Sequence, residues 1–356
     1  MLKKTTCIGL MSGTSLDGLD IALCSFWEEN GELNFDIIEA DTQAYSIDWV
    51  TRLSNTHRFS AYQFSLLNNQ YGTYLGQQVN DFINKYGLNK TDIAFIASHG
   101  HTVFHNPNDK ITIQIGDGSA IYNETGIKTI FDFRRLDVYR GGQGAPLVPI
   151  GDHLLFPEYD FCLNLGGFAN ISYAHGNNRT AFDIVPANIV LNHVAHSIGL
   201  QYDSDGIKAS QGEINTDLLK SLNSLEYYKK QPPKSLGREW VEQYVIPLIE
   251  TNSIKPDDLL RTFVEHICIQ IAGATSYLPQ GKVLTTGGGV FNTFLISRLQ
   301  QLCKHEIVIP SQRLIKFKEA LIFALLGYLK NLNRTNALAS VTGATIDSIT
   351  GIVIEE

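Results

Sequence analysis

Apolar and polar residues follow the same plan twice along this chain. In each round two apolar strands flank a turn rich in glycine, and a third strand with alternating apolar and polar positions follows. This pattern predicts a three-stranded antiparallel meander at the start of each round. The predicted strands cover residues 6–10, 19–26 and 33–40 in the first round, and residues 161–165, 169–174 and 180–184 in the second.

Further helices and strands are predicted after each meander. Apolar residues spaced as on one helix face predict a long amphipathic helix over 60–86, ended by Gly87. A buried strand at 93–98 is expected to lead into a loop that contains His99, Gly100, His101 and Thr102. The other predicted strands are 111–115, 128–131, 283–286 and 307–310, and the other helices are 118–124, 188–198, 256–275, 317–329, one ending at 250 and one beginning near 292.

The two rounds predict two α/β domains that face each other, with a ligand cleft expected between them. At 356 residues the chain is also too long for one ordinary core. We expect the first domain to comprise residues 1–132 and to be completed by 330–356. The second domain is expected to comprise residues 133–329.

Composition narrows the classes of partner. Hydrophobic residues make up 44% and charged residues 18% of the chain, as in globular proteins. The net charge of −8 and the lack of a long Lys/Arg run argue against nucleic acid or an anionic membrane as a partner. No apolar run is long enough to span a bilayer, and the first residues do not read as a secretory signal. The five cysteines show no Cys-x-x-Cys spacing, so we expect reduced thiols in a cytoplasmic protein.

The turn of the first meander is the first candidate ligand site. Glycines in this turn are expected to adopt positive φ, which would let backbone N–H groups and hydroxyls wrap phosphate oxygens. Asp17 would then hold a hydrated Mg²⁺ that bridges the phosphates. The alternative is an ordinary glycine turn with no ligand. The turn and the residues that follow it are Gly13, Thr14, Ser15, Leu16, Asp17, Gly18, Leu19 and Asp20.

Glycine-rich segments stand at four places in the chain, each at a strand end or a domain junction. They are centred on Gly13, Gly142, Gly166 and Gly287. No Gly-Lys-Ser/Thr follows a strand, which excludes a P-loop. Any one of these segments is more simply a structural turn, but four of them in two repeated rounds favour a nucleotide held from both sides.

Asp183 is the candidate general base. It lies at the end of the third strand of the second round, and we expect it to face the cleft opposite Asp17. A partly buried aspartate acts as a base when it is within hydrogen-bond reach of the proton to be removed. The alternative is that Asp183 caps the helix that follows.

Histidines and arginines near the end of the first domain form a further polar group. His99, His101 and His105 have a spacing compatible with a metal site, although no cysteine or carboxylate cluster supports it. The other interpretation is a polar loop whose imidazole N–H groups meet sugar or carboxylate oxygens. Arg134 precedes the GGQGAP segment, and its guanidinium suits a carboxylate substrate unless it is solvated.

Taken together, these segments resemble the anhydro-N-acetylmuramic acid kinase family, which belongs to the superfamily of sugar kinases, actin and heat-shock chaperones. The resemblance covers nearly the whole chain, and it implies two ribonuclease-H-like domains with ATP between them. The motifs that carry it are GLMSGTSLDGLD from Gly9, ASHGHTVFHNP from Ala97, DFRRLDVYRGGQGAPLVP from Asp132, LNLGGFANIS from Leu163, KSLGREW from Lys234, TTGGGVFN from Thr285, KEALIFALLGY from Lys318 and SVTGA from Ser340.

The resemblance implies a kinase that uses Mg·ATP on 1,6-anhydro-N-acetylmuramic acid, a product of peptidoglycan turnover. The aspartate that matches Asp183 deprotonates a water, the water attacks the anomeric carbon, and the released oxygen takes the γ-phosphoryl group. The product is N-acetylmuramate 6-phosphate. Residues 13–20 match the family's ATP-phosphate segment and 287–289 its adenosine-side loop. The implied adenosine-side residues are Gly287, Gly288 and Gly289, and the expected substrate contacts are His99, Arg134, Gln143, Gly144 and Asn188.

Three departures from the family pattern bear on substrate preference more than on fold. The usual Asp-Thr-Gly-Pro-Gly-Asn is Asp183-Ile-Val-Pro-Ala-Asn188 here, a usual Gln is His101, and a usual Thr is Leu236. A kinase for a related amino sugar therefore stays open. So does a non-catalytic ATP-responsive protein of the actin type, and so does a homodimer.

Overall fold

The computed structural model describes residues 3–13, 16–176, 178–250 and 254–356. The chain forms two compact units, Met1–Phe156 with Phe317–Glu356, and Pro157–Lys316. The units therefore divide after Phe156 and after Lys316, whereas the sequence pattern places the boundaries after 132 and 329. Residues 133–156 belong with the first unit because they contact its strands and loops. One of these contacts joins Arg134 to His99.

The first unit is built on a mixed sheet with the order β13-β7-β4-β1-β2-β3. Strands β1, β2 and β3 form the predicted antiparallel meander, and β4 and β7 extend it in parallel. A separate antiparallel pair, β5 and β6, lies outside this sheet. The strands are β1 Thr5–Ser12, β2 Gly18–Glu29, β3 Glu32–Ala44, β4 Ile96–Ser98, β5 His101–Asn106, β6 Ile111–Ile115, β7 Thr129–Phe131 and β13 Ile352–Ile354.

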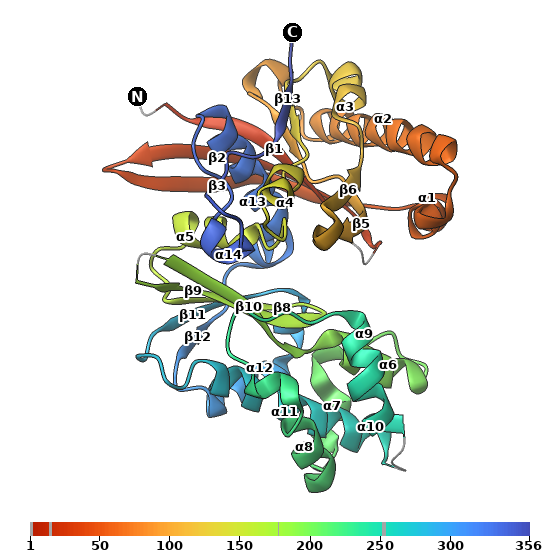
Figure 1. Cartoon of the computed structure of the whole chain (residues 1–356), viewed down its shortest axis with the longest axis vertical. Coiled ribbons are helices and arrows are strands. Elements are labelled where there is room, and N and C mark those ends of the chain that lie inside the picture. The colour runs from red at the N-terminus through yellow and green to blue at the C-terminus, as the bar shows by residue number, and fades with distance from the viewer. Residues whose placement is uncertain (1–2, 14–15, 177, 251–253) are drawn as a thin grey trace. The chain divides into compact units, whose positions relative to one another are not determined.

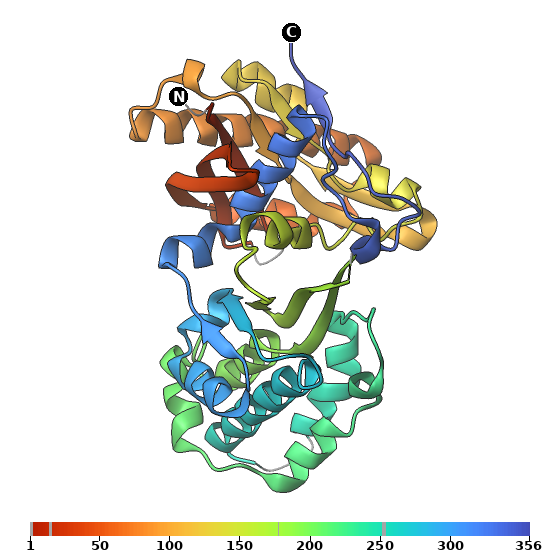
Figure 2. The same cartoon turned by 90° about the vertical axis from the view of Figure 1, so that its left-hand side faces the viewer.

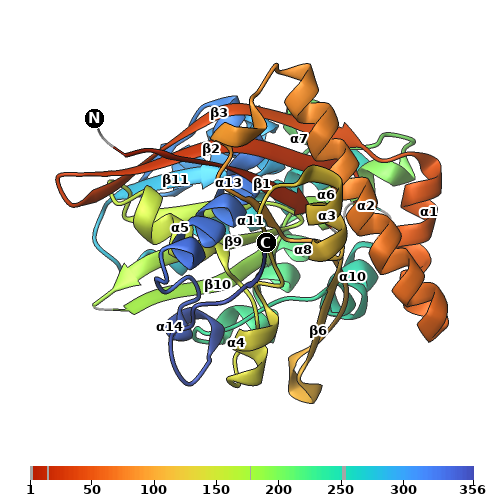
Figure 3. The ribbon, with the colours of Figure 1, turned by 90° about the horizontal axis from the view of Figure 1, so that it is seen from above.

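Helices of the first unit bury their apolar faces against this sheet and one another. The predicted long helix is present as α2, and Ser60 and Gln63 form a capping box at its start. Figure 3 shows α2 beside α3, and the two pack closely where Gly72 meets the backbone of Asp117. The helices are α1 Ile47–Asn55, α2 Ala61–Lys85, α3 Gly118–Thr125, α4 Arg135–Tyr139, α5 Val148–Leu155, α13 Gln312–Asn331 and α14 Ala339–Thr342.

Helix α13 lies directly against strand β1, as the blue helix and red strands of Figure 2 show. The contact is close because residue 9 has no side chain: a Cβ on Gly9 would collide with the carbonyl oxygen of Ala320. Gly327 on the same helix approaches Phe95 and Ala97 in the same way. The residues after 316 are therefore an integral part of the first unit.

The second unit repeats the strand order of the first. Its sheet has the order β10-β9-β8-β11-β12, with an antiparallel meander of β8, β9 and β10 and parallel strands β11 and β12 beside β8 (Figure 1). This shared order confirms the predicted α/β class with two similar sheets. The strands are β8 Phe161–Leu165, β9 Phe168–His175, β10 Asn178–Pro186, β11 Lys282–Thr286 and β12 Glu306–Val308.

The core of the second unit is formed by the sheet together with helices α6 to α8 and α10 to α12. Helix α11 is its most buried helix, with Phe263, Val264 and Ile267 almost fully covered. A π-helical turn, Val241–Val245, joins α9 to α10. The helices are α6 Asn188–Ser197, α7 Ile207–Gln211, α8 Thr216–Asn223, α9 Arg238–Trp240, α10 Ile246–Glu250, α11 Pro256–Ala274 and α12 Thr293–Leu302.

Two local predictions need correction. His101 and Thr102 do not lie in a loop but begin strand β5, because their backbone pairs with Gln114 and Ile115 of β6. The short helices α1, α4, α5, α7, α8 and α14 were not predicted. Among the described helices, none combines the length and apolar character needed to cross a membrane.

Candidate functional site

The turn between β1 and β2 contains the predicted phosphate-binding residues. Thr14 and Ser15 lie outside the described residues. In the rest of the turn, the N–H of Leu16 donates to the carbonyl of Gly13 at 3.4 Å, and Leu16 has a φ of 61°. Asp17 is exposed. Among the described residues of the turn, Asp17 thus presents its carboxylate to solvent.

The positive φ expected at Gly18 is wrong. The positive φ falls at Leu16, while Gly18 is the first residue of β2. Glycine is needed there for space, because a Cβ would lie 2.6 Å from the carbonyl oxygen of Gln43 on β3.

Asp20 follows the turn on β2 and is partly buried. Its Oδ1 accepts a 2.6 Å hydrogen bond from the Thr42 hydroxyl. Burial raises the pKa of Asp20, the Thr42 hydrogen bond lowers it, and the charge of Asp17 raises it. The two carboxylates therefore repel each other across the turn, which is the kind of field that a cation relieves.

Buried hydroxyl groups form a chain of hydrogen bonds at the end of β1, next to the turn. Ser12, the last residue of β1, accepts a 2.8 Å hydrogen bond from the Tyr45 hydroxyl, which is 2.6 Å from the Tyr71 hydroxyl. The Ser12 Oγ lies 3.0 Å from Nδ1 of His101. Burial lowers the pKa of His101 to about 4, so its ring is neutral at pH 7 and accepts the Ser12 proton at Nδ1.

His99 and Arg134 form a second buried contact in the first unit. Nε and Nη2 of Arg134 lie 3.1 and 3.0 Å from Nε2 of His99, and Nη1 donates to the carbonyl of Gly144 at 2.7 Å. Burial, and then the Arg134 charge, lower the pKa of His99 well below its usual value. His99 is thus neutral, with its proton on Nδ1, and that atom has no hydrogen-bond partner among the described residues. Arg134 is not a solvated surface residue.

The loop that contains Gln143 and Gly144 is fixed from behind. Asp137 is fully buried; its Oδ2 accepts from the N–H of Gly144 at 2.7 Å, and its Oδ1 accepts from the Thr342 hydroxyl at 2.7 Å. The N–H of Gln143 donates to the carbonyl of Thr342 at 2.8 Å, which leaves the Gln143 side chain exposed. The VTGA motif therefore holds the GGQGAP loop in place.

The three histidines do not converge on a metal. In the described part of the chain no group of three or more His, Cys, Asp or Glu side chains could hold a metal ion. One ring nitrogen of each histidine is instead taken up within the protein, by Arg134 for His99, by Ser12 for His101 and by Thr112 for His105.

Asp183 lies on β10 in the second unit, where the register with β9 shifts between Asp183 and Val185. Its Oδ2 accepts a 2.9 Å hydrogen bond from the N–H of Leu236. Burial raises the pKa of Asp183 and the Leu236 hydrogen bond lowers it. Asp183 does not cap the next helix, because the N-cap of α6 is Ala187 and no side chain caps it. The capping alternative is therefore excluded.

The Gly287–Gly289 segment meets Asn188 at the ends of β8 and β11. Gly287 has a φ of 88°, and a Cβ there would lie 2.5 Å from Oδ1 of Asn164. A Cβ on Gly289 would lie 2.8 Å from Cβ of Leu165 and 3.5 Å from Nδ2 of Asn188, whereas one on Gly288 would meet nothing within 4 Å. Asn188 also donates to the carbonyl of Leu165 at 3.3 Å. Gly288 thus borders open space beside a carbonyl-rich strand end.

Sequence reasoning missed two groups beside these residues. Glu319 on α13 has an exposed side chain, and the charges that act on it include those of Arg134 and Asp20: the Arg134 charge lowers its pKa and the Asp20 charge raises it. The signal was its place in the KEALIFALLGY motif, where it is the one acidic residue. Tyr227 contacts the backbone of Asp183, and no motif indicated it.

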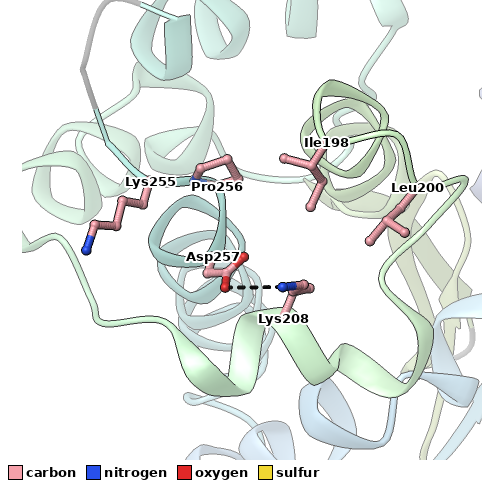
Figure 4. Close-up of a pocket in the computed structure, with 6 residues that line it drawn as sticks. All are labelled: Ile198, Leu200, Lys208, Lys255, Pro256 and Asp257. Carbon is pink, nitrogen blue, oxygen red and sulfur yellow. Dashed lines mark ion pairs between the residues drawn. The ribbon is translucent and has the colours of Figure 1, made fainter.

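A pocket of about 420 Å³ lies elsewhere in the second unit (Figure 4). Its lining includes an ion pair between Lys208 and Asp257 at 3.7 Å. None of the predicted site residues lines it. The lining residues are Ile198, Leu200, Lys208, Lys255, Pro256 and Asp257.

Comparison with known proteins identifies the family of this sequence. The family model described as anhydro-N-acetylmuramic acid kinase matches residues 5–356. The anhydro-N-acetylmuramic acid kinase of Shewanella putrefaciens (strain CN-32) is 35% identical, covering 98% of each chain, and that of Shewanella sp. (strain MR-7) is 36% identical with the same coverage. Among solved structures, component A of the (R)-2-hydroxyglutaryl-CoA dehydratase of Acidaminococcus fermentans is 12% identical, covers 92% of this chain and 99% of its own, and has a TM-score of 0.49. The match of the family model and of relatives along almost the whole length shows that the chain belongs to the anhydro-N-acetylmuramic acid kinase family.

Proposed function

We propose that this protein is an ATP-dependent kinase that phosphorylates 1,6-anhydro-N-acetylmuramic acid at O6 while it opens the anhydro ring by hydrolysis. The product would be N-acetylmuramate 6-phosphate, formed during peptidoglycan recycling. Family membership supports the reaction class and the use of ATP. The observation that carries the proposal is Asp183, a partly buried carboxylate with one oxygen fixed by a backbone N–H.

In the proposed reaction Asp183 takes a proton from a water molecule. The water oxygen forms a bond to the anomeric carbon, and the bond from that carbon to the bridging oxygen breaks. The electron pair of the broken bond stays on that oxygen, which attacks the γ-phosphorus, and ADP leaves. A raised pKa makes Asp183 a stronger base than an exposed aspartate, provided that it is ionised at the working pH.

The opening turn supports the phosphate end of the proposal. Backbone N–H groups in the turn suit phosphate oxygens, and Gly288, within the Gly287–Gly289 segment assigned to the adenosine side, borders open space. Asp17 is exposed and repels Asp20, so the turn fits a hydrated Mg²⁺ held by Asp17 through water. Bound there with ATP, Mg²⁺ would neutralise charge on the transferring phosphoryl group. We thus assign the phosphate turn to the first domain and the base with the adenosine-side loop to the second.

On the sugar side we assign His99, Arg134, Gln143, Gly144 and Asn188. Gln143 has an exposed side chain on a braced loop, which suits a hydrogen bond to a ligand. Arg134 spends three N–H groups on His99 and Gly144, so it acts mainly by orienting His99. We also propose a cytoplasmic enzyme, because its co-substrate ATP is found there, and a homodimer, which sedimentation analysis would test.

The test is to incubate the purified protein with Mg·ATP and a panel of anhydro and free amino sugars. ADP release that requires the anhydro sugar, with transfer of phosphate to O6, is the expected result. Turnover of another amino sugar alone would favour the related kinase, and ATP binding without any sugar-dependent turnover would favour the non-catalytic protein.

Asp183→Asn tests the base. We expect it to abolish turnover and to leave ATP affinity unchanged, because the amide cannot accept the proton. Asp217→Asn, which changes an exposed aspartate in the first turn of α8, is the matched control and should keep full activity. Retained turnover in Asp183→Asn would refute the assignment.

A further inference from the structure

Asp183 lies on an edge strand of the second sheet. Strand β10 is the last strand on its side of the sheet, and within the described residues β9 is its only partner strand. The register shift after Asp183 breaks the ladder at this point. A bulge on an edge strand re-aims its side chains, but it leaves backbone groups that need other partners.

One segment, 227–236, supplies those partners. The Tyr227 hydroxyl donates to the Asp183 carbonyl at 2.6 Å, and the Asp183 N–H donates to the carbonyl of Lys234 at 3.2 Å. The N–H of Leu236 donates to Oδ2 of the carboxylate at 2.9 Å. The backbone of Asp183 is therefore held on both sides, and its carboxylate is held by one oxygen.

The segment is itself closed by a contact between its two ends. Nζ of Lys234 donates to the carbonyl of Tyr227 at 3.3 Å and lies 4.7 Å from the centre of the Tyr227 ring. Tyr227 is 4% exposed, and its ring packs against that of Trp240 with centroids 5.4 Å apart. The Tyr227 hydroxyl thus projects from a rigid base.

We propose that Tyr227 and Lys234–Leu236 are positioning residues that fix the general base Asp183 for reaction. This inference rests on the proposed function. We call Tyr227 and Lys234–Leu236 the clamp. Among the described residues no hydrogen bond reaches Oδ1 of Asp183. The clamp therefore holds Oδ2 and leaves Oδ1 for the water that loses its proton. Proximity of this kind matters because a displacement of about 1 Å can cost on the order of a hundredfold in rate.

The clamp also accounts for a departure from the family pattern. The family resemblance implies a Thr at the position where this chain has Leu236. The hydrogen bond to Asp183 comes from the backbone N–H at this position, so the loss of a side-chain hydroxyl leaves it intact. Leucine at 236 is therefore compatible with a positioned base.

The first test is Tyr227→Phe, which removes only the hydroxyl. We expect kcat to fall roughly 3- to 10-fold, the effect of one hydrogen bond, with KM for ATP unchanged. The matched control is Tyr228→Phe, because the Tyr228 hydroxyl meets His266 at 2.9 Å and does not reach Asp183. That variant should keep the wild-type kcat.

The second test is Leu236→Pro against Leu236→Ala. Proline removes the N–H that lowers the pKa of Asp183, so the acidic limb of the kcat profile should move to higher pH. Alanine keeps the N–H and should keep the wild-type profile. A side chain with a merely structural role would change the melting temperature without moving this limb.

The outcomes separate the clamp from the reaction itself. If wild-type protein turns over the anhydro sugar and Tyr227→Phe has the same kcat and pH profile, the clamp is refuted and the function stands. If wild-type protein shows no sugar-dependent turnover, the proposed function is refuted and the clamp falls with it. If Leu236→Pro does not fold, the comparison of kcat between Tyr227→Phe and Tyr228→Phe is sufficient to accept or refute the clamp.

Discussion

Asp183 must be ionised to act as a base, and this sets the pH dependence that we expect at the scale of single residues. Burial raises its pKa above the ordinary value of 3.8. As pH falls through that raised pKa, the carboxylate is protonated and kcat should fall in proportion. A profile of kcat against pH measured with saturating sugar and ATP checks this. An acidic limb at or below pH 3.8 would contradict the expectation.

His266 carries a second prediction, on stability. It is fully buried, with Nδ1 2.7 Å from Oδ1 of Asn223 and Nε2 2.9 Å from the Tyr228 hydroxyl. Burial lowers its pKa from 6.5 to about 3. Between these values the unfolded chain binds a proton that the folded chain does not, so the free energy of unfolding should fall as pH falls, by about 1.4 kcal/mol per pH unit.

Denaturant titrations between pH 7 and 4 would measure this slope. His266→Phe removes the titrating group and should make the slope shallower, even though it also lowers stability at pH 7. His193 has an exposed ring, so His193→Gln should keep the wild-type slope. Equal slopes for wild type and His266→Phe would show that His266 does not cause the acid sensitivity.

At this scale the sequence predicted residues with a recognisable motif and missed those without one. Asp183 could be singled out because a strand pattern ends there. Tyr227 could not, because it lies 44 positions away and only folding brings its hydroxyl to the Asp183 carbonyl. Leu236 contacts Asp183 through its backbone N–H, for which side-chain identity gives no signal.

Among the elements, the contact of β1 with α13 makes the sharpest prediction. Gly9→Ala would place a methyl group against the backbone carbonyl of Ala320, and neither backbone can move without shifting the sheet or the helix. We expect a loss of about 3 kcal/mol or more in the free energy of unfolding, measured by thermal or denaturant unfolding. A change below about 1 kcal/mol in the free energy of unfolding would mean that α13 does not pack against β1 as closely as described.

Gly273→Ala is the matched control for that substitution. Gly273 is near the end of α11, and a Cβ there would meet nothing within 4 Å. Alanine is the better helix former by roughly 1 kcal/mol, so this variant should be as stable as the wild type or slightly more stable.

Elements with strong periodicity were predicted well. The bounds of β6 and β8 match the prediction, and α2 differs by one residue at each end. The β5 strand was missed because its first residues, His101 and Thr102, are polar and follow a glycine. Its pairing with β6 is a property of two segments rather than one. Short helices such as α8 hold too few turns to show a period.

At the scale of the whole molecule, the chain passes from one unit to the other twice, after Phe156 and after Lys316. A buried ion pair between Asp152 and Lys318 lies near both of these crossings in the sequence. Nζ of Lys318 is 2.7 Å from Oδ1 of Asp152, with side chains only 7% and 4% exposed, and it lies 5.4 Å from the centre of the Phe156 ring. Lys318→Met would remove the cation of this pair and its 2.7 Å contact with the Asp152 carboxylate. We expect a loss of about 1.5–3 kcal/mol in unfolding free energy, the effect of one hydrogen bond to a charged group, measured by denaturant titration.

Two further variants test whether that loss of stability comes from the buried charge. The double variant Asp152→Leu with Lys318→Met removes both charges and should recover most of the stability. Lys229→Met breaks an exposed pair with Glu226 and should change stability by less than about 1 kcal/mol. A double variant no better than Lys318→Met would point to packing rather than to the charge.

At this scale the repeat of two meanders predicted two similar α/β units, and the structure adds that their sheets share one strand order. The positions of the crossings were not predicted from composition. Phe156-Pro157 and Lys316-Phe317 lie in ordinary sequence without a Gly/Ser-rich linker, and α13 runs through the second crossing as one continuous helix.

The split first unit has a consequence for synthesis on the ribosome. Residues 157–316 emerge as one uninterrupted stretch and can fold while translation continues. Strand β1, made near the start, must wait for α13 before its glycine-lined face is covered, and β7 must wait for β13. We therefore expect the nascent first unit to expose apolar surface for most of elongation, which makes it the part of the chain that a holding chaperone would meet.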